Sequence, residues 1–347
     1  MYKGARVAVV VPAYNEEARI GDVLDTMPLF VDLVVVVDDS SDDSTAPVLA
    51  VYAERLGTRL AVRRHARRAG VGRAIATGYQ VALQHDADVV AVMAGDGQMA
   101  PTELATVLDP VVEGRADYAK GNRLFTGEAW RRTPKVRYLG NAFLSLCTKI
   151  ASGYWHVADS QSGFTAISRA ALEALDLDGL YPRYGYPNDM LVRLNVLGAR
   201  VADVPVTPLY GIGERSSMRI WRVIPPITWL LLRGFLWRLG QRYVIRDFHP
   251  LVFFYLWGAL LFVAGFGLGA FETYLKLTTG AIAVATVVLA ALLVTSGLHL
   301  LLFATWFDME YNRSLRVGEP TGLTARARPA VLRPPDVPAA TGERARE

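Results

Sequence analysis

Short apolar runs alternate with amphipathic stretches over roughly the first two hundred residues of the chain. The apolar runs predict strands at Val7–Val11, Leu33–Val37, Leu60–Val62, Val89–Ala94, Tyr118–Gly121 and Val201–Pro205. The amphipathic stretches between them predict helices at Ala18–Met27, Ala46–Leu56 and Gly72–His85. Strands that alternate with helices indicate an α/β domain, with a largely parallel sheet and helices on both of its faces.

Two long apolar segments follow this part of the chain. Leu251–Phe271 has no charged residue, and in Leu277–Phe307 the only ionisable side chain is His299. About twenty apolar residues cross the hydrocarbon core of a bilayer as a helix. The pattern therefore predicts a multi-pass protein of the cell membrane with two transmembrane helices, in which the polar residues Glu272–Lys276 form the turn.

The segment that joins these two parts combines tryptophans with arginines. Trp221, Trp229 and Trp237 recur at every eighth position of Ser216–Arg246. We interpret the segment as amphipathic interfacial helices, broken at Pro225-Pro226, with aromatic residues in the lipid and arginines beside the headgroups. A helix that packs against the core and extends its arginines to solvent is the alternative.

The net charge, the cysteine content and the placement of arginines limit the class of protein and its orientation in the membrane. The net charge of +4 is too small to indicate nucleic-acid binding, and the single cysteine, Cys147, excludes an internal disulfide and fits a reducing compartment. Arginines crowd the segment before the first apolar stretch, and Arg313 and Arg316 follow the second. This bias predicts that the α/β domain and both termini face the cytoplasm.

The chain is thus expected to have four parts. The α/β domain (1–213) is followed by interfacial helices (214–249), two transmembrane helices (250–307) and a cytoplasmic tail (308–347). The tail is rich in Pro, Ala and Arg beyond Gly318, which predicts disorder.

Polar side chains follow three of the predicted strands. Asn15-Glu16 ends the first strand, Asp38-Asp39 ends the second, and Asp96 ends the fourth. In open parallel sheets, ligands bind at the carboxyl ends of the strands, so we expect these residues to share one site. Ordinary turn and helix-capping chemistry is the alternative.

The residue types at this edge indicate a metal and a nucleotide. Asp96 and Gln98 offer hard oxygen donors that suit Mg²⁺ or Mn²⁺, with substrate phosphates and water completing the shell; a plain Asp-Gly turn is the alternative. The acidic loop Asp38–Thr45 is a poor phosphate cradle, so we assign its carboxylates to a nucleoside, with helix caps and exposed loop charge as the alternative. The arginines around Gly70-Val71-Gly72 lack the spacing of a phosphate-binding loop, which argues against an ATPase.

Five motifs follow one another in a recognisable order: Pro12–Glu17 (PAYNEE), Val37–Thr45 (VDDSSDDST), Asp96–Gln98 (DGQ), Ser162–Phe164 (SGF) and Gly213–Ser216 (GERS). Together they closely resemble family 2 glycosyltransferases with the GT-A fold. More narrowly, the chain is similar to the group of dolichol-phosphate mannose synthase and the bacterial polyprenyl-phosphate glycosyltransferases. The resemblance covers roughly residues 6–217, and the two-helix anchor is similar to that of the bacterial members.

The resemblance implies a role for each matching residue. The residues implied at the base and ribose are Pro12, Tyr14, Glu16, Asp38 and Asp39. Those implied at the metal and the donor phosphates are Asp96, Gln98 and Arg123, and those implied on the acceptor side are Asp159 and Asp189. Many relatives have an aspartate where this chain has Ala94, so the metal ligands beyond Asp96 and Gln98 stay open.

The resemblance also implies the reaction. One hexose-type sugar would pass with inversion from a UDP- or GDP-linked donor to a polyprenyl phosphate at the cytoplasmic membrane face, and a homo-oligomer would fit the group. A phosphate monoester is largely dianionic at neutral pH, so it needs no strong general base. We expect Arg215 and Arg219 to contact the acceptor phosphate or the membrane surface.

Two other functions compete with this one. Processive polysaccharide synthases share the catalytic fold, but those enzymes usually carry Q-x-x-R-W near the membrane and need more helices to form a channel. Met218–Trp221 lacks that pattern. A catalytically inactive membrane scaffold is favoured only by Ala94, since Asp39, Asp96 and Gln98 are present.

Overall fold

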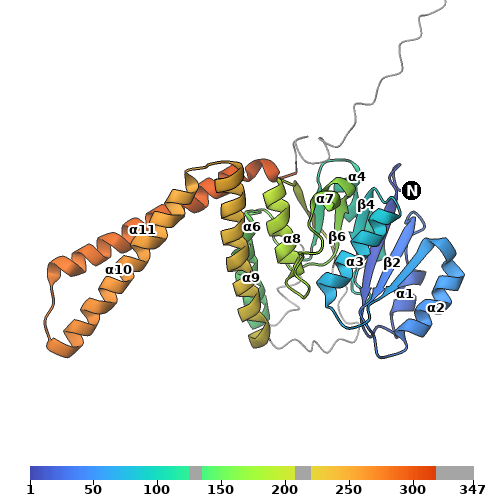
Figure 1. Cartoon of the computed structure of the whole chain (residues 1–347), viewed down its shortest axis with the longest axis horizontal. Coiled ribbons are helices and arrows are strands. Elements are labelled where there is room, and N and C mark those ends of the chain that lie inside the picture. The colour runs from blue at the N-terminus through green and yellow to red at the C-terminus, as the bar shows by residue number, and fades with distance from the viewer. Residues whose placement is uncertain (125–134, 208–219, 318–347) are drawn as a thin grey trace, which may run out of the picture.

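The computed structural model describes residues 1–124, 135–207 and 220–317; the side chains of residues 135–139, 141 and 220–224 are not described. A sheet covered by helices forms one end of the molecule, and a long helical hairpin projects from its side (Figure 1). We call residues 1–207 the sheet domain. Arg215 and Arg219 lie outside the described residues.

A seven-stranded sheet forms the centre of this domain. Its strands are β1 (Val7–Ala13), β2 (Leu33–Asp38), β3 (Leu60–Arg64), β4 (Val89–Val92), β5 (Tyr118–Asn122), β6 (Thr165–Ser168) and β7 (Val201–Pro205). They are ordered β3-β2-β1-β4-β6-β5-β7, and all pairs are parallel except those that β6 makes with β4 and β5. The predicted, largely parallel sheet is confirmed. Strand β6 is missing from the prediction because its four residues are short of apolar side chains.

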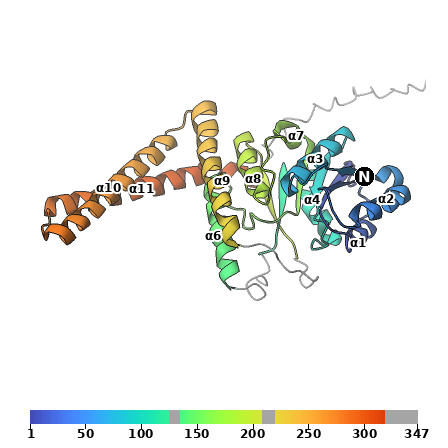
Figure 2. The same ribbon diagram turned by 60° about the horizontal axis from the view of Figure 1, so that its bottom comes forward.

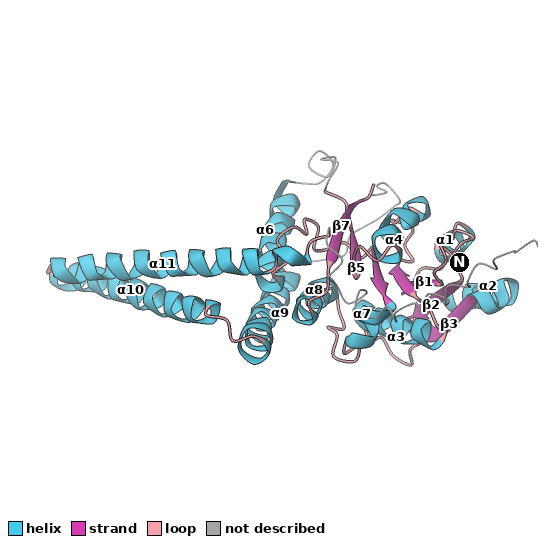
Figure 3. Cartoon of the chain, turned by 90° about the horizontal axis from the view of Figure 1, so that it is seen from above, coloured by secondary structure: helices cyan, strands magenta, loops and turns pink. Residues whose placement is uncertain are grey.

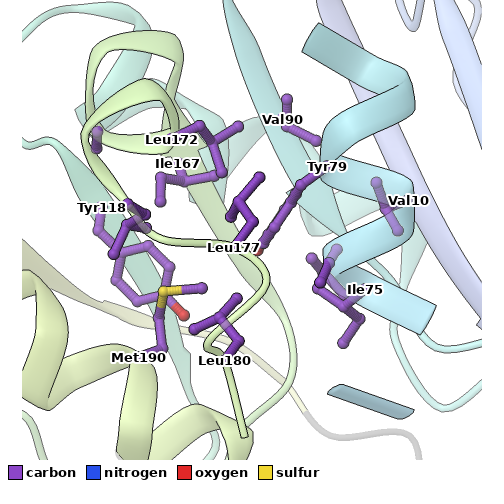
Figure 4. Packing of buried hydrophobic residues seen from close by; sticks show 14 of the residues in the cluster. Val10, Ile75, Tyr79, Val90, Tyr118, Ile167, Leu172, Leu177, Leu180 and Met190 are labelled. Carbon is purple, nitrogen blue, oxygen red and sulfur yellow. The ribbon is translucent and has the colours of Figure 1, made fainter. Parts of the chain in front are cut away.

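Helices cover both faces of the sheet and divide the core into two layers (Figure 1). In the described residues of the domain, the α-helices are α1 (Ile20–Asp25), α2 (Thr45–Leu56), α3 (Val71–Gln84), α4 (Leu104–Val112), α6 (Lys135–Ser152), α7 (Arg169–Ala174) and α8 (Tyr186–Leu197). Side chains alternate along a strand, so Ala8 and Val10 pack with α3, α7 and α8. Val9 and Val11 pack with α1, α2 and α4 on the other face. Figure 4 shows the first layer, in which Val10, Ile75 and Tyr79 lie where α3 crosses β1.

A single long helix, α9 (Ile220–Gly240), follows the sheet domain and continues through Pro225 and Pro226. The predicted break at these prolines is therefore wrong. Each proline lacks the backbone N–H that would bond four residues back, so two hydrogen bonds are lost near the start of the helix. Beyond the prolines, Ile227 and Leu231 pack on α6 and α8, which holds the helix on the domain.

The hairpin consists of α10 (Leu251–Thr279) and α11 (Val284–Tyr311), which are long and apolar enough to cross a membrane. Glu272–Lys276 continue α10, so the turn lies later in the chain than predicted. No residue between Glu272 and Lys276 breaks a helix, whereas Gly280 takes a left-handed φ of +71° and ends α10. Helix α11 extends past the predicted boundary at residue 307 to Tyr311.

Three arginines of the predicted interfacial segment turn toward the sheet domain. Arg238 is fully buried. Arg242 and Arg246 donate to the carbonyl oxygens of Asn195 and Val196 at the C-terminal end of α8, where the helix dipole is negative. The interpretation of the arginines as headgroup contacts is therefore wrong for Arg238, Arg242 and Arg246. The helical spacing of the segment shows that its tryptophans and arginines lie on different faces. It does not show which of these faces packs against the sheet domain.

Gly78 lies where α3 crosses β1, and a Cβ there would be 2.2 Å from Cγ1 of Val10. We expect Gly78→Ala to lower the free energy of unfolding by about 1–3 kcal/mol, because the added methyl group overpacks the core. Denaturant unfolding of the detergent-solubilised protein, followed by tryptophan fluorescence, measures the change. Gly140→Ala is the control, since among the described residues nothing beyond its chain neighbours and its own helix backbone lies within 4 Å of its Cβ position. Equal losses at both positions would contradict the packing argument.

Candidate active site

The candidate site lies along the edge of the sheet where the parallel strands end. The strand register places Pro12 beside Val37 and Ala13 beside Asp38. A Cβ on Gly95, in the loop after β4, would lie 3.2 Å from the carbonyl oxygen of Pro12. Arg19 Nη1 also donates to the carbonyl oxygen of Asp96 over 2.9 Å. The loops after β1, β2 and β4 therefore meet, as their polar sequences predict.

The loops after β1 and β2 are fastened to each other by hydrogen bonds. The backbone amide of Asn15 donates to Ser41 Oγ over 3.0 Å, and the backbone amide of Glu16 donates to Thr45 Oγ1 over 2.9 Å. The side chains of Asn15 and Asp42 also bond to each other. Asp42 thus serves the loop structure, in keeping with the turn-chemistry alternative for this residue. The half-buried side chains of Pro12, Tyr14 and Glu16 are held on this rigid support.

Asp39 is buried and fixes the loop that follows β3. Its carboxylate accepts hydrogen bonds from the backbone amides of Ala69 and Gly70, over 2.8 and 2.7 Å. His65 Nδ1 lies 2.7 Å from the same carboxylate. Asp39 is only 4% exposed, which excludes the alternative that it is exposed loop charge. Its direct contact with base or ribose stays a prediction.

Asp38 has a similar position one residue earlier. It is 1% exposed and accepts a hydrogen bond from the Ser41 amide over 2.8 Å. Arg64 Nε lies 3.2 Å from its other carboxylate oxygen. Asp38 therefore ties the acidic loop to the end of β3, and its predicted nucleoside contact also stays a prediction.

The loop held by Asp39 places a cation over an aromatic ring. The guanidinium carbon of Arg68 lies 3.8 Å from the centre of the Tyr14 ring. This contact joins the first and third loops of the edge across the face that Tyr14 presents. This cation–π contact holds the Tyr14 ring in place at the edge of the sheet. The sequence pattern does not single out Arg68 among the arginines around it.

The predicted metal ligands lie in the turn after β4. The backbone amide of Gln98 donates to Asp96 Oδ1 over 3.0 Å, and Gly97 has a φ of +72°. The side chains of Asp96 and Gln98 therefore lie on one tight turn. Within the described ranges, no three His, Cys, Asp or Glu side chains form a metal cluster. Magnesium commonly binds through one or two carboxylates plus substrate phosphates. The pair therefore fits a metal that the substrate helps to hold.

A charged cluster closes the other end of the site, after β5. Asp159 is 3% exposed and accepts from Arg123 Nε over 2.7 Å and from Arg123 Nη2 over 3.1 Å. Burial opposes ionisation of Asp159, but the hydrogen bonds and the charge of Arg123, together with the charge of Lys120, outweigh it and lower the pKa of the carboxyl group. The structure thus brings together two residues that the resemblance assigns to different substrates.

Lys120 lies behind this pair and is absent from the predicted site. It is fully buried, and its ammonium group donates to the carbonyl oxygen of Ser162. Burial lowers the pKa of Lys120 to about 8, although the nearby Asp159 favours its charged form. A lysine inside an otherwise uncharged strand, directly before Gly121-Asn122-Arg123, is the sequence signal that identifies it.

Asp189 does not join this cluster. It lies in the first turn of α8, where it accepts from the Tyr181 amide and from Arg193 Nε, each over 2.9 Å. These bonds fasten α8 to the loop before it. The neighbouring Asn188 makes the link to the site, since its side-chain oxygen accepts from Gln161 Nε2 over 2.8 Å.

Comparison with known proteins identifies the family. The profile "Glycosyl transferase family 2" matches residues 8–176. The chain is 30% identical to undecaprenyl-phosphate mannosyltransferase of Micrococcus luteus over 207 residues, covering 58% of this chain and 83% of that protein. This chain belongs to glycosyl transferase family 2. The resemblance read from the five motifs is thereby confirmed, and the protein is a glycosyltransferase.

Other relatives agree with this assignment. This family 2 glycosyltransferase is 29% identical over 216 residues to UDP-N-acetylglucosamine--dolichyl-phosphate N-acetylglucosaminyltransferase of Methanococcus voltae, covering 59% of this chain and 86% of that protein. Among solved structures, mannosyl-3-phosphoglycerate synthase from Rubrobacter xylanophilus aligns with a TM-score of 0.52 at 20% identity. That alignment covers 69% of this chain and 75% of the other, and it supports the expected GT-A fold.

The buried Lys120 makes stability depend on pH in a defined direction. Between pH 8 and 10.5 the unfolded chain holds a proton on this lysine that the folded chain has lost, so stability rises with pH. Relative to Lys120→Met, the wild type should gain up to about 3 kcal/mol of unfolding free energy across this range. Denaturant unfolding of both proteins at several pH values measures the difference. A constant difference would show that Lys120 does not titrate in this range.

Proposed function

We propose that this family 2 glycosyltransferase moves one hexose-type sugar from a UDP- or GDP-linked donor to a polyprenyl phosphate at the cytoplasmic face of a membrane. One observation carries the proposal: the glycosyltransferase site is joined, through a helix with an exposed apolar face, to two helices of bilayer length. The relatives from M. luteus and M. voltae support the same acceptor class, since their names specify undecaprenyl phosphate and dolichyl phosphate.

Helices α6 and α9, which lie between the sheet and the hairpin, carry exposed apolar side chains. On α9, Trp229 is 66% exposed, and Leu232 and Leu236 lie exposed on the same helical face. On α6, which packs along α9 (Figure 2), Phe143 is 66% exposed and Leu146 is also exposed. Large apolar side chains on this face suit the interfacial region of a bilayer. A polyprenyl chain stays in the bilayer, so its phosphate must be reached from such a surface.

The chemistry requires little from the protein beyond placement and charge. An oxygen of the acceptor phosphate attacks the anomeric carbon of the sugar while the bond from that carbon to the nucleoside diphosphate breaks, which inverts the configuration. The acceptor is largely dianionic at neutral pH and needs no strong base. This agrees with the engagement of Asp159, whose carboxylate is committed to Arg123. Arg123, oriented in this way, would stabilise the charge that develops on the leaving diphosphate.

The remaining assignments follow the same edge of the sheet. Asp96 and Gln98 would hold Mg²⁺ or Mn²⁺, which when bound neutralises part of the donor diphosphate charge. The residues that we assign to the nucleoside are Pro12, Tyr14, Glu16, Asp38 and Asp39. We assign Asp189, Arg215 and Arg219 to the acceptor side of the site. Asp189 would act there indirectly, by fastening α8 to the loop before it.

A transfer assay tests the proposal directly. The purified protein, supplied with a panel of UDP- and GDP-linked sugars and a polyprenyl phosphate, should form a lipid-linked monosaccharide with at least one donor. Mass spectrometry of the extracted lipid identifies both the sugar and the number of sugars added. A product with several sugars would favour a processive synthase, and no lipid product with any donor would refute the acceptor.

Asp96→Asn should lower the rate of transfer by at least about 100-fold, because it removes a charged oxygen ligand whose metal supplies several kcal/mol of charge stabilisation. EDTA should have the same effect on the wild type, reversed by Mn²⁺ or Mg²⁺. Asp22→Asn, an exposed position in α1, is the matched control. Full activity of the Asp96 variant with an unchanged unfolding temperature would show that Asp96 is no ligand.

The proposed topology predicts which positions are accessible from outside the cell. With Cys147 replaced by Ser, a cysteine at Thr279, beside the hairpin turn, should react with a membrane-impermeant maleimide on intact cells. A cysteine at Ala174, exposed on the sheet domain, should react only after permeabilisation. The opposite pattern of labelling would place the catalytic domain outside.

A further inference from the structure

A buried ion pair joins the hairpin to the sheet domain. Arg238 of α9 and Asp308 of α11 are both 0% exposed. Arg238 Nη1 and Nη2 donate to the two carboxylate oxygens of Asp308 over 2.8 and 3.0 Å, which is a bidentate pairing. Arg238 also donates to the carbonyl oxygens of Ile150 and Ala151 at the end of α6. One guanidinium group therefore fastens three helices.

Three further polar side chains form a hydrogen-bond network with this ion pair. Tyr243 donates its hydroxyl hydrogen to Asp308, and Asn312 Nδ2 donates to the Tyr243 oxygen over 2.9 Å. Asn195 of α8 donates to Asn312 Oδ1 over 2.9 Å, which brings in a fourth helix. We call these five residues the joint: Asn195, Arg238, Tyr243, Asp308 and Asn312. All five are buried.

The backbone after α6 approaches the joint closely at a glycine. Gly153, after α6, has a φ of +75°, and a Cβ there would lie 2.7 Å from Arg238 Nη1 and 3.0 Å from Asn312 Nδ2. Beyond the joint the chain returns to the sheet domain: Leu315 packs in its core, and Arg316 forms a bridge with Val201 of β7. The α11 end of the hairpin thus continues into the sheet domain, whereas the α10 end packs on α9 through Leu251 (Figure 3).

Helix α8 carries this connection to the candidate site. Its C-terminal end contacts the joint through Asn195, and its N-terminal end contacts the loop that contains Asp159. Asn188 accepts from Gln161 there, and the Tyr186 hydroxyl lies 3.3 Å from the Cβ position of Gly163. One straight helix therefore links the root of the hairpin to the acceptor side of the site.

We propose that Arg238 and Asp308 are positioning residues, which fix the angle between the hairpin and the sheet domain and so hold the active site at the depth of a lipid acceptor. A buried ion pair is weak evidence for stability, because apolar residues of similar size often replace it without loss. Its bidentate geometry does, however, restrict the angles at which the helices can meet. The proposal rests on the proposed function for its lipid acceptor.

The length of the hairpin makes this angle important. Helix α10 has 29 residues, so at 1.5 Å per residue it is about 43 Å long. A change of about 10° at the joint would displace one end relative to the other by about 7 Å. Misplacement by even about 1 Å can cost about 100-fold in rate when two reactants must be aligned. A loose joint should therefore impair transfer to an acceptor held in the bilayer, and spare transfer to one that diffuses freely.

The test replaces the ion pair by apolar residues in the full-length protein. Arg238→Met/Asp308→Leu leaves no unpaired charge, so the protein should fold. The matched control is Arg313→Met/Glu310→Leu, which removes an exposed ion pair at the same end of α11. Each variant is assayed in nanodiscs with a long-chain polyprenyl phosphate, and in solution with a short, water-soluble isoprenyl phosphate.

We expect the joint variant to lose at least 10-fold in kcat for the embedded acceptor, with its KM for the nucleotide-sugar and its rate on the soluble acceptor within twofold of wild type. The control should keep both rates. Equal losses on both acceptors would mean that the pair only maintains the fold, and unchanged rates would mean that the angle is set elsewhere; either result overturns the proposal.

A measurement without turnover separates this proposal from the proposed function. Spin labels at Ala174→Cys and Thr279→Cys, with Cys147 replaced by Ser, report the distance between the sheet domain and the tip of the hairpin. The joint variant should broaden the distance distribution relative to wild type and control. An unchanged distribution refutes the proposal even if no polyprenyl phosphate proves to be a substrate. A broadened one without lipid transfer by the wild type refutes the proposed function alone.

Discussion

A sheet with helices on both faces leaves only its edges for polar chemistry. The side chains of β1 and β2 are buried on either side, so both strands are nearly continuous runs of valine. Polar groups that enter this domain must find partners, because an unpaired buried charge is costly. Asp39 obtains them from backbone amides, and Asp159 from Arg123. The same bonds that satisfy these charges fix the loops, and the site is rigid as a consequence.

The parts of the fold that the sequence predicts are those with a local cause. Runs of apolar residues predict six strands, and helical periods predict three helices. Strand β6 does not, because its place depends on neighbours already in the sheet. The position of the hairpin turn depends on helix-ending geometry at Gly280 rather than on polarity. Helix α9 keeps its prolines because packing on α6 and α8 outweighs their local effect.

The candidate site divides in a similar way. Strand ends predict that Asp38, Asp39 and Asp96 share an edge, since parallel strands finish together. What each carboxylate binds depends on residues far along the chain: the two amides that bind Asp39 lie 30 and 31 residues away. The partner of Arg238 lies 70 residues away, just past the apolar segment of α11. The sequence shows an acidic residue, Asp308, at the end of an apolar segment. It does not show that Arg238 is its partner.

These features acquire a common meaning if the acceptor is a lipid. A soluble substrate brings its own freedom of movement, and the enzyme need only close around it. A phosphate fixed at the bilayer surface has one accessible depth, so the enzyme must present its site at that depth. On our proposals, the apolar faces of α6 and α9 would set how closely the domain approaches the lipid, and the joint would set its inclination. Catalytic placement in such an enzyme then extends from the sheet edge, along α8, to the membrane helices themselves.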